Sequence, residues 1–205
     1  MGQARGRTRK IAVTGGAASG KSSVCRRLRE KGLTVISLDE VSKELMRPGQ
    51  SVYTKVVQDF GPGVVRADGT LDRAALRSMI SRDPGARTRL ESVVQPAILE
   101  EMERQIRASE TRGEPMVVVE VPLLFELNME SRFDVSVLVA LDEEVQVSRL
   151  AIRDGVSEQA ARDLIALQMP LEQKKTRADI VIDNNGPPEK LNRDVDCLLV
   201  RAFEK

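Results

Sequence analysis

The sequence predicts an α/β fold in which a parallel five-stranded sheet is covered by helices. Short runs rich in β-branched residues alternate with amphipathic helical stretches, which is typical of strands joined by helical crossovers. A second observation is a glycine-rich loop directly after the first of these runs. A third is a gap of nearly eighty residues with helical periodicity between the second and third runs, which is too long for a simple crossover.

Five short runs are expected to form the sheet, and together they suit the middle layer of a three-layer core. They are Ile11–Thr14, Thr34–Ser37, Met116–Val121, Val135–Leu141 and Ile180–Ile182.

The long gap between the second and third runs is expected to be an inserted helical subdomain. Its last helix is predicted to begin at Pro96 and to end at Gly113, because proline suits the first helical turn and glycine the position after the last. Four apolar residues share one face of this helix, namely Ile98, Leu99, Met102 and Ile106.

Composition narrows the possible chemistry. The chain has 205 residues, enough for one enzyme domain. Its formal net charge of +1 indicates no extended electrostatic field that would attract nucleic acid or a membrane. There is no histidine, so histidine zinc sites, histidine bases and Ser-His-Asp triads are excluded. The two cysteines, Cys25 and Cys197, lie far apart without metal-ligand spacing, which favours a reducing compartment.

No segment is expected to enter a membrane. The longest apolar stretch, Val117–Phe125, is interrupted by Glu120 and Pro122 and is too short to cross a bilayer. Residues 1–9 are basic, lack a signal-peptide hydrophobic core and are expected to be a flexible lead-in.

The most specific motif is Gly15–Ser22, which satisfies Gly-x-x-x-x-Gly-Lys-Ser between a predicted strand and a predicted helix. Such a loop wraps its N–H groups around phosphates, Lys21 reaches the β- and γ-phosphates, and Ser22 binds Mg²⁺. The alternative is a chance glycine-rich turn, but the strand–loop–helix context favours a nucleoside triphosphate site.

The loop does not itself say how the triphosphate is used. The Asn-Lys-x-Asp motif with which a GTPase reads its base is missing from the sequence, and aromatic residues, at 2%, are too few for a typical nucleic-acid motor. A small-molecule kinase is therefore favoured, and a slowly hydrolysing switch is the alternative from another class.

Asp39 follows the second strand, whose carboxyl end lies on the substrate-binding edge of such a sheet. Its carboxylate could orient an acceptor hydroxyl and take its proton late in the transfer. It could equally be the N-cap of the helix that follows. Position alone does not decide between these two interpretations.

Two pairs of arginines have the four-residue spacing that places side chains on one helix face. Arg149 and Arg153 could clamp phosphates from a mobile lid, or form a solvated surface with Glu144 or Asp154. Arg73 and Arg77 could cradle the phosphates of an anionic substrate, or be exposed surface residues.

Taken together, the motifs resemble the dephospho-coenzyme A kinase family from about residue 10 to the C-terminus. The similarity lies in the order and spacing of the following segments: Thr14–Ser23, Ile36–Asp39, Phe60–Gly61, Asp68–Leu76, Leu90–Ile98, Val121–Glu126, Gln146–Gly155, Gln168 and Ala178–Gly186.

The resemblance implies a three-layer P-loop kinase core with an inserted helical substrate-binding subdomain and a helical lid. The core would comprise residues 10–38, 114–144 and 178–205, the coenzyme A-binding insert 39–113 and the lid 145–177. It also implies a cytoplasmic enzyme that transfers the γ-phosphoryl of ATP to the ribose 3′-hydroxyl of dephospho-coenzyme A with Mg²⁺, the last step of coenzyme A biosynthesis. Another P-loop nucleotide or small-molecule kinase is the alternative. The expected assembly is a monomer or a weak homo-oligomer.

The resemblance further assigns roles to individual residues. Asp39, Lys21, Arg149 and Arg153 would be catalytic. The residues expected to hold ATP are Gly16, Ala17, Ala18, Ser19, Gly20, Lys21, Ser22, Ser23 and Asn184, with Asn185 also near the adenine. Those expected on the acceptor side are Asp39, Arg73, Arg77, Gln95, Pro122 and Leu123. The structural alternatives are that Asn184 and Asn185 form an ordinary turn, and that Pro122–Glu126 is the buried end of a strand.

Three positions depart from the family pattern. Gln95 stands where the family usually has histidine, so an ionic role at that position is lost. Ser37 replaces the first acid of Asp-x-Asp and leaves Asp39 as the only carboxylate of the pair. Ala18 replaces a common loop glycine, which we expect to be tolerated if its φ is negative.

Overall fold

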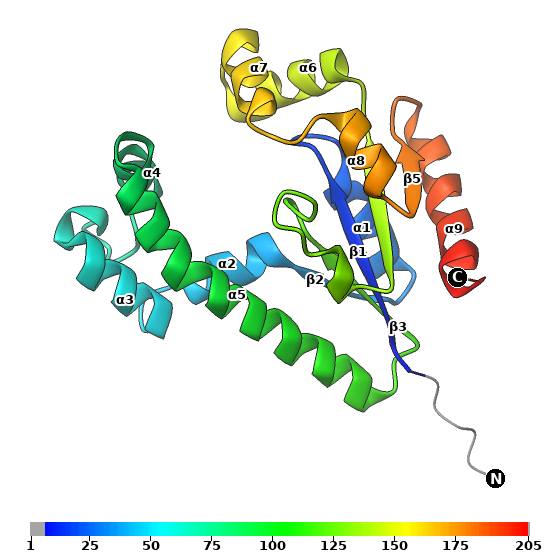
Figure 1. The fold of residues 1–205 in the computed structure, drawn as a ribbon, viewed down its shortest axis with the longest axis horizontal. Helices are drawn as coiled ribbons and strands as arrows, with labels where there is room; N and C mark the ends of the chain where they lie inside the picture. The colour runs from blue at the N-terminus through cyan, green and yellow to red at the C-terminus, as the bar shows by residue number, and fades with distance from the viewer. Residues whose placement is uncertain (1–6, 205) are drawn as a thin grey trace. The chain divides into compact units, whose positions relative to one another are not determined.

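The computed structural model describes residues 7–204, and the side chains of residues 7–198 (Figure 1). Residues 1–6 of the predicted lead-in lie outside the described residues. Thr8 and Arg9 do not fit that prediction, because Arg9 begins the first strand and its N–H donates to the Pro115 carbonyl at 3.0 Å. The Thr8 hydroxyl also donates to the Glu114 carbonyl, at 2.7 Å, so hydrogen bonds to Glu114 and Pro115 order this part of the chain.

The sheet contains five strands within the described part of the chain. They are β1 (Arg9–Gly15), β2 (Thr34–Ser37), β3 (Met116–Glu120), β4 (Val135–Ala140) and β5 (Ile180–Asp183). All neighbours pair in parallel, in the order β2-β3-β1-β4-β5. Each strand lies within two residues of its predicted bounds, so the predicted parallel sheet is confirmed.

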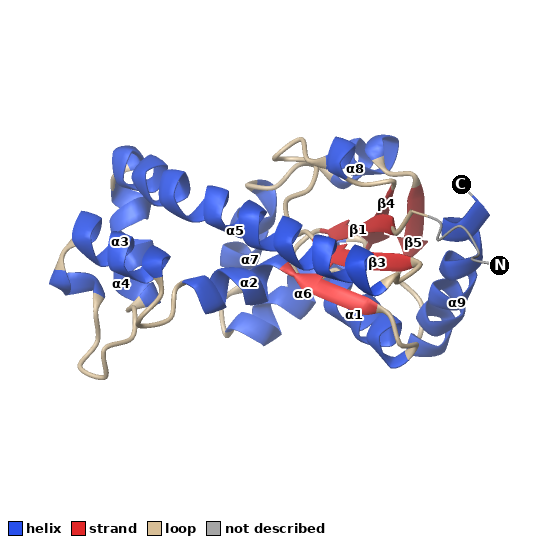
Figure 2. Cartoon of the chain, turned by 90° about the horizontal axis from the view of Figure 1, so that it is seen from below, coloured by secondary structure: helices blue, strands red, loops and turns tan. Residues whose placement is uncertain are grey.

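The chain divides into two compact units, and the sheet belongs to the first, which comprises residues up to 37 and from 108 onward. Its helices are α1 (Lys21–Glu30), α6 (Glu143–Asp154), α7 (Glu158–Ala166), α8 (Leu171–Arg177) and α9 (Pro188–Glu204), with a 3₁₀ turn, η2 (Glu130–Arg132). Figure 2 shows α1 and α9 on one side of the sheet and α8 on the other. Because helices cover both faces, β3 and β4 are buried along their whole length, which explains their uninterrupted apolar sequences.

The main core of this unit lies between the sheet and the helices α1 and α9. Val24, Cys25 and Leu28 of α1 pack with Leu191 and Val195 of α9 against the inward-facing residues of the strands. This cluster fixes the start of α1, and therefore the loop that precedes it, against the carboxyl edge of β1.

The second unit, residues 38–107, is helical. Its elements are α2 (Leu38–Leu45), α3 (Ser51–Phe60), the 3₁₀ turn η1 (Pro62–Val64), α4 (Arg73–Arg82) and most of α5 (Pro84–Arg112). The Asp72 side chain caps α4 by accepting from the N–H groups of Ala74 and Ala75, which the helix itself leaves without acceptors. Val56, Phe60 and Leu76 are among the residues of its own hydrophobic cluster.

The predicted start of the last insert helix at Pro96 is wrong. Helix α5 begins at Pro84 and contains Pro96 in its interior. Residues on both sides of this proline, including Val94 and Ile98, pack into the cluster of the second unit. Tertiary packing therefore outweighs the hydrogen bond that proline cannot donate. The predicted stop is confirmed, since Gly113 has a φ of 72° directly after Arg112.

Among the described helices there is none that combines the length and the apolar character needed to span a membrane.

Candidate active site

The glycine-rich loop joins β1 to α1 and is shaped to enclose an anion. Gly20 precedes the helix with a φ of 100°, and a Cβ atom there would lie 2.2 Å from Nδ2 of Asn184, so only glycine fits. The Lys21 ammonium donates to the carbonyls of Gly15 and Gly16 at 2.9 and 2.8 Å. Its charge is thus held over the loop, at the positive end of the helix dipole.

Alanine at position 18 was expected to be tolerated in place of glycine if its φ were negative, and its φ is not negative. Its φ is 56°, in the left-handed region that disfavours side chains with a Cβ atom. The loop therefore contains a strained residue where the family commonly has glycine.

Ser22 lies beside a carboxylate that the sequence analysis did not assign to the site. Its hydroxyl donates to Oε1 of Glu120 at 2.9 Å, and Glu120 is only 7% exposed at the carboxyl end of β3. Both are oxygen donors of the kind that Mg²⁺ prefers. A charged residue ending the run Met-Val-Val-Val was the signal that could have identified Glu120.

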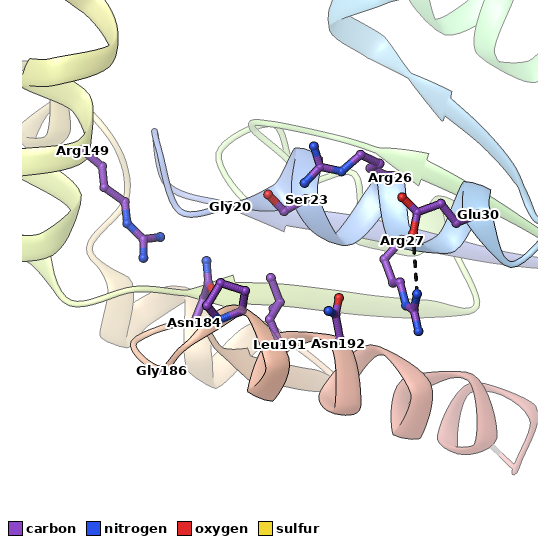
Figure 3. Close-up of a pocket in the computed structure, with 11 residues that line it drawn as sticks. Gly20, Ser23, Arg26, Arg27, Glu30, Arg149, Asn184, Gly186, Leu191 and Asn192 are labelled. Carbon is purple, nitrogen blue, oxygen red and sulfur yellow. Dashed lines mark ion pairs between the residues drawn. The ribbon is translucent and has the colours of Figure 1, made fainter.

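A pocket of about 480 Å³ opens beside the end of this loop (Figure 3). It is lined by Gly20, Ser23, Arg26, Arg27, Glu30, Arg149, Asn184, Gly186, Pro188, Leu191 and Asn192. Four residues predicted for ATP binding or catalysis therefore meet here: Gly20, Ser23, Arg149 and Asn184. Its mixture of aliphatic and polar groups suits a flat heterocycle next to phosphates.

The two predicted lid arginines differ in their surroundings. Figure 3 shows the Arg149 side chain reaching from α6 toward Asn184. Arg153, one turn later, donates to its neighbour Asp154 at 2.7 Å and is exposed, as the solvated alternative anticipated. Glu144, the other partner considered, pairs instead with Arg162.

The two asparagines after β5 also differ in their hydrogen-bond partners. Asn184 is 6% exposed and donates from Nδ2 to the Ser19 carbonyl at 2.8 Å, so it supports the loop as well as lining the pocket. Asn185 instead accepts from the Asp142 N–H at 2.9 Å and links the turns that follow β4 and β5.

Two glutamines meet the loop from the helices after β4. Oε1 of Gln168, between α7 and α8, accepts from the Ala17 N–H at 3.0 Å. Gln146 of α6 is buried, and its amide leaves no space for a Cβ atom at Gly16. Both line a second cavity of about 320 Å³ that reaches Gly16. Neither glutamine has a role predicted from the sequence, because no local pattern marks a contact with a loop more than a hundred residues earlier.

The segment after β3 contains the predicted acceptor-side residues Pro122 and Leu123. Leu123 is partly exposed, whereas the next two residues, Leu124 and Phe125, are fully buried in the core. The segment therefore combines an accessible start with the buried strand end that was its alternative. It closes with Glu126, whose Oε1 lies 2.7 Å from Nζ of the buried Lys174 on α8.

Asp39 lies in the first turn of α2, which begins one residue earlier at Leu38. It is therefore not the N-cap residue that the alternative interpretation required. Its side chain is exposed, and no hydrogen bond or ion pair holds it within the described part of the chain. The carboxylate remains available to a ligand.

In the second unit, three predicted substrate residues border one groove of about 290 Å³. Arg73 and Arg77 of α4 face Gln95 of α5 across a floor that is largely apolar. The remaining lining residues are Ser42, Met46, Leu71, Leu76, Ile80, Leu90, Glu91 and Val94. Neither arginine makes an ion pair with another described residue, so both guanidinium groups can take an anion.

Comparison with known proteins shows to which family this chain belongs. The family model described as dephospho-CoA kinase matches residues 9–189, which include the loop, the helical unit and α6–α8. The chain belongs to the dephospho-CoA kinase family. A relative carrying that name from Symbiobacterium thermophilum is 44% identical over 189 residues, covering 92% of this chain and 79% of the relative.

Solved structures share the fold of this chain. TT1252 from Thermus thermophilus superposes with a TM-score of 0.83 at 33% identity, over 96% of this chain and 98% of that one. A dephospho-CoA kinase from Campylobacter jejuni, 21% identical, has a TM-score of 0.71 over 93% of this chain and 95% of its own, and supports the fold. The predicted P-loop kinase fold class is thereby confirmed.

Proposed function

We propose that this protein transfers the γ-phosphoryl group of ATP to the ribose 3′-hydroxyl of dephospho-coenzyme A, giving coenzyme A and ADP. One observation carries the proposal: the family match spans the phosphate loop, the helical unit and the helices α6–α8 without interruption. Curated relatives named dephospho-CoA kinase are 40–44% identical over 92–97% of this chain.

The phosphates are proposed to bind at the loop between β1 and α1. The loop from Gly16 to Ser23 surrounds them with backbone N–H groups other than that of Ala17, which Gln168 holds, and Lys21 exchanges its two loop carbonyls for phosphate oxygens. This arrangement offsets the negative charge that builds up during transfer. The adenosine is proposed to occupy the 480 Å³ pocket, with Asn184 and Pro188 among its neighbours.

Mg²⁺ is proposed to bind through Ser22, with Glu120 orienting that hydroxyl or a bound water. Their oxygen chemistry fits this ion, and the described residues contain no group of three or more acidic, cysteine or histidine side chains that could hold a metal alone. That suits Mg²⁺, which usually keeps several waters and relies on substrate phosphates. Bound there, the ion would neutralise phosphate charge.

The acceptor is proposed to bind through the helical unit. The apolar groove suits the aliphatic pantetheine arm, Arg73 and Arg77 suit its pyrophosphate, and Gln95 offers an uncharged hydrogen-bonding amide. Pro122 and Leu123 are proposed to contact the same substrate. Asp39 is proposed to orient the attacking hydroxyl and to accept its proton late, since a loose transfer requires little early deprotonation.

The lid, α6–α8, is proposed to supply positive charge to the transferring group. Arg149 is the better supported of the two arginines because it already lines the nucleotide pocket. Arg153 is proposed to join it by giving up its contact with Asp154, a surface pair worth only about 0.2 to 1 kcal/mol.

The deciding experiment measures ADP release with a panel of acceptors. Dephospho-coenzyme A should stimulate turnover strongly and should gain one phosphoryl group by mass spectrometry, whereas nucleoside monophosphates and shikimate should not. Stimulation by a different acceptor would identify another P-loop kinase. ATP consumption that is independent of every acceptor would favour the switch interpretation.

A further inference from the structure

Two side-chain amides hold the phosphate loop on either side of its strained residue. Before Ala18, the Ala17 N–H donates to Oε1 of Gln168 at 3.0 Å. After it, the Ser19 carbonyl accepts from Nδ2 of Asn184 at 2.8 Å. A residue other than glycine keeps a positive φ only where its surroundings enforce it. Each of these amides thus holds the backbone at one neighbour of Ala18.

Gln168 is itself held by a buried ion pair. The N–H of the next residue, Met169, donates to Oε1 of Glu126 at 3.1 Å. The same oxygen lies 2.7 Å from Nζ of Lys174, whose side chain is 2% exposed, while that of Glu126 is 19% exposed. One carboxylate therefore ties the chain after Gln168 to helix α8.

The charge state of Glu126 is consistent with this role. Burial by itself raises the pKa of its carboxyl group, but the hydrogen bond and charge of Lys174 and the backbone donors, including the Met169 N–H, outweigh burial and leave the pKa below its ordinary value. The carboxylate is thus ionised at neutral pH and accepts both contacts.

We propose that Gln168 is a positioning residue for nucleotide binding, which holds the strained phosphate loop ready for ATP, and that the Glu126–Lys174 ion pair holds Gln168 in place. This inference rests on the proposed function only in requiring that the loop bind ATP; the identity of the acceptor does not enter it.

The expected effect follows from preorganisation. Loop N–H groups bind phosphate well only if they already point inward, so a loop that must first be ordered binds ATP more weakly. One neutral hydrogen bond contributes enough to change an equilibrium constant about 3- to 10-fold. Losing the Gln168 contact should therefore weaken ATP binding by that factor and should affect kcat less.

The test is calorimetric titration with a non-hydrolysable ATP analogue, without an acceptor, on wild type, Gln168→Ala and Gln173→Ala. Gln173 is an exposed glutamine of α8 and serves as the matched control. We expect about 3- to 10-fold weaker binding for Gln168→Ala and wild-type binding for the control. Equal affinity of all three proteins would overturn the proposal.

Thermal melting separates positioning from general damage to the fold. A positioning role leaves Gln168→Ala folded at the titration temperature while its affinity for the analogue falls. If the loss reflected only a weakened fold, the folded fraction of Gln168→Ala at that temperature would fall by the same factor as its affinity, and that result would overturn the positioning role.

The ion pair is tested by replacing both partners, Glu126→Leu with Lys174→Met, which avoids leaving one buried charge alone. The Met169 N–H then loses its acceptor, and we expect ATP binding to weaken about threefold. Unchanged affinity would overturn the part assigned to the pair. A wild-type protein that bound no ATP analogue would overturn the proposed function itself, and this inference with it.

Discussion

Replacement of Ala18 by glycine tests the strain in the phosphate loop directly. At a φ of 56°, the Cβ atom of alanine costs roughly 1 to 2 kcal/mol, which glycine does not incur. Glycine also makes the unfolded chain more flexible, at a cost of about 0.4 to 1 kcal/mol. The middle values of the two ranges differ by about 0.8 kcal/mol, so Ala18→Gly is predicted to stabilise the protein by roughly that amount.

The matched control is Ala17→Gly in the same loop. Ala17 is not among the described residues with positive φ, so its replacement by glycine has the entropic cost without any relief. The two variants should therefore differ in free energy of unfolding by roughly 1 to 2 kcal/mol, or about 2 to 8 °C in melting temperature for a chain of this size. Urea denaturation and thermal melting both measure this difference.

Equal destabilisation by both substitutions would refute the reasoning, because it would mean that Ala18 is not strained in solution. A loss larger for Ala18→Gly than for Ala17→Gly would refute it more strongly, since it would show that the alanine methyl group contributes favourable contacts.

Four further predictions concern catalysis and charge. Lys21→Ala should lower phosphoryl transfer by at least about 100-fold with an unchanged melting temperature, since the ammonium serves phosphate charge; near-normal turnover would contradict this. Arg149→Ala should lose about 2 to 4 kcal/mol of transition-state stabilisation, and this loss should lower kcat more than it raises the KM for ATP. Arg149→Lys should restore only part of the activity, and full activity of Arg149→Ala would mean that Arg149 is an ordinary solvated surface residue. Asp39→Asn should bind both substrates normally and lose most of its kcat, whereas retained turnover would exclude the carboxylate from catalysis. The pKa of Glu126 is lower in the folded protein than the value of about 4.3 in the unfolded chain, so the stabilisation by its ion pair with Lys174 is present above pH 4.3 and is lost as the pH falls through the folded-state pKa. Denaturation between about pH 6 and 3 should therefore show wild type losing stability relative to Glu126→Leu/Lys174→Met. A difference in stability that stays constant over this pH range would be inconsistent with the prediction.

The sequence by itself determined the fold class and the type of ligand. Strands such as Met116–Glu120 are recognisable because burial on both faces requires continuous apolar residues. The motif Gly15–Ser22 is equally local, since eight consecutive residues contain the turn, the charge and the hydroxyl that a triphosphate requires.

Helix boundaries in the insert were less accessible to local reasoning. Pro96 is a reasonable helix start by local rules, yet it lies inside α5 because residues on both sides of it pack into the same cluster. Such packing depends on residues of α3 and α4, which lie outside the few residues around Pro96 that local rules consider. Local rules therefore could not decide between a new helix and a continuing one.

The supports of the phosphate loop were decided by tertiary structure alone. Glu120, Gln168 and Lys174 reach their partners across roughly 50 to 150 residues, and each belongs to a residue type that is usually found at the surface. The positive φ of Ala18 is likewise a property of the closed loop, not of alanine. A sequence pattern records what neighbours along the chain prefer, whereas these contacts exist only because parallel strands bring their carboxyl ends to one edge of the sheet.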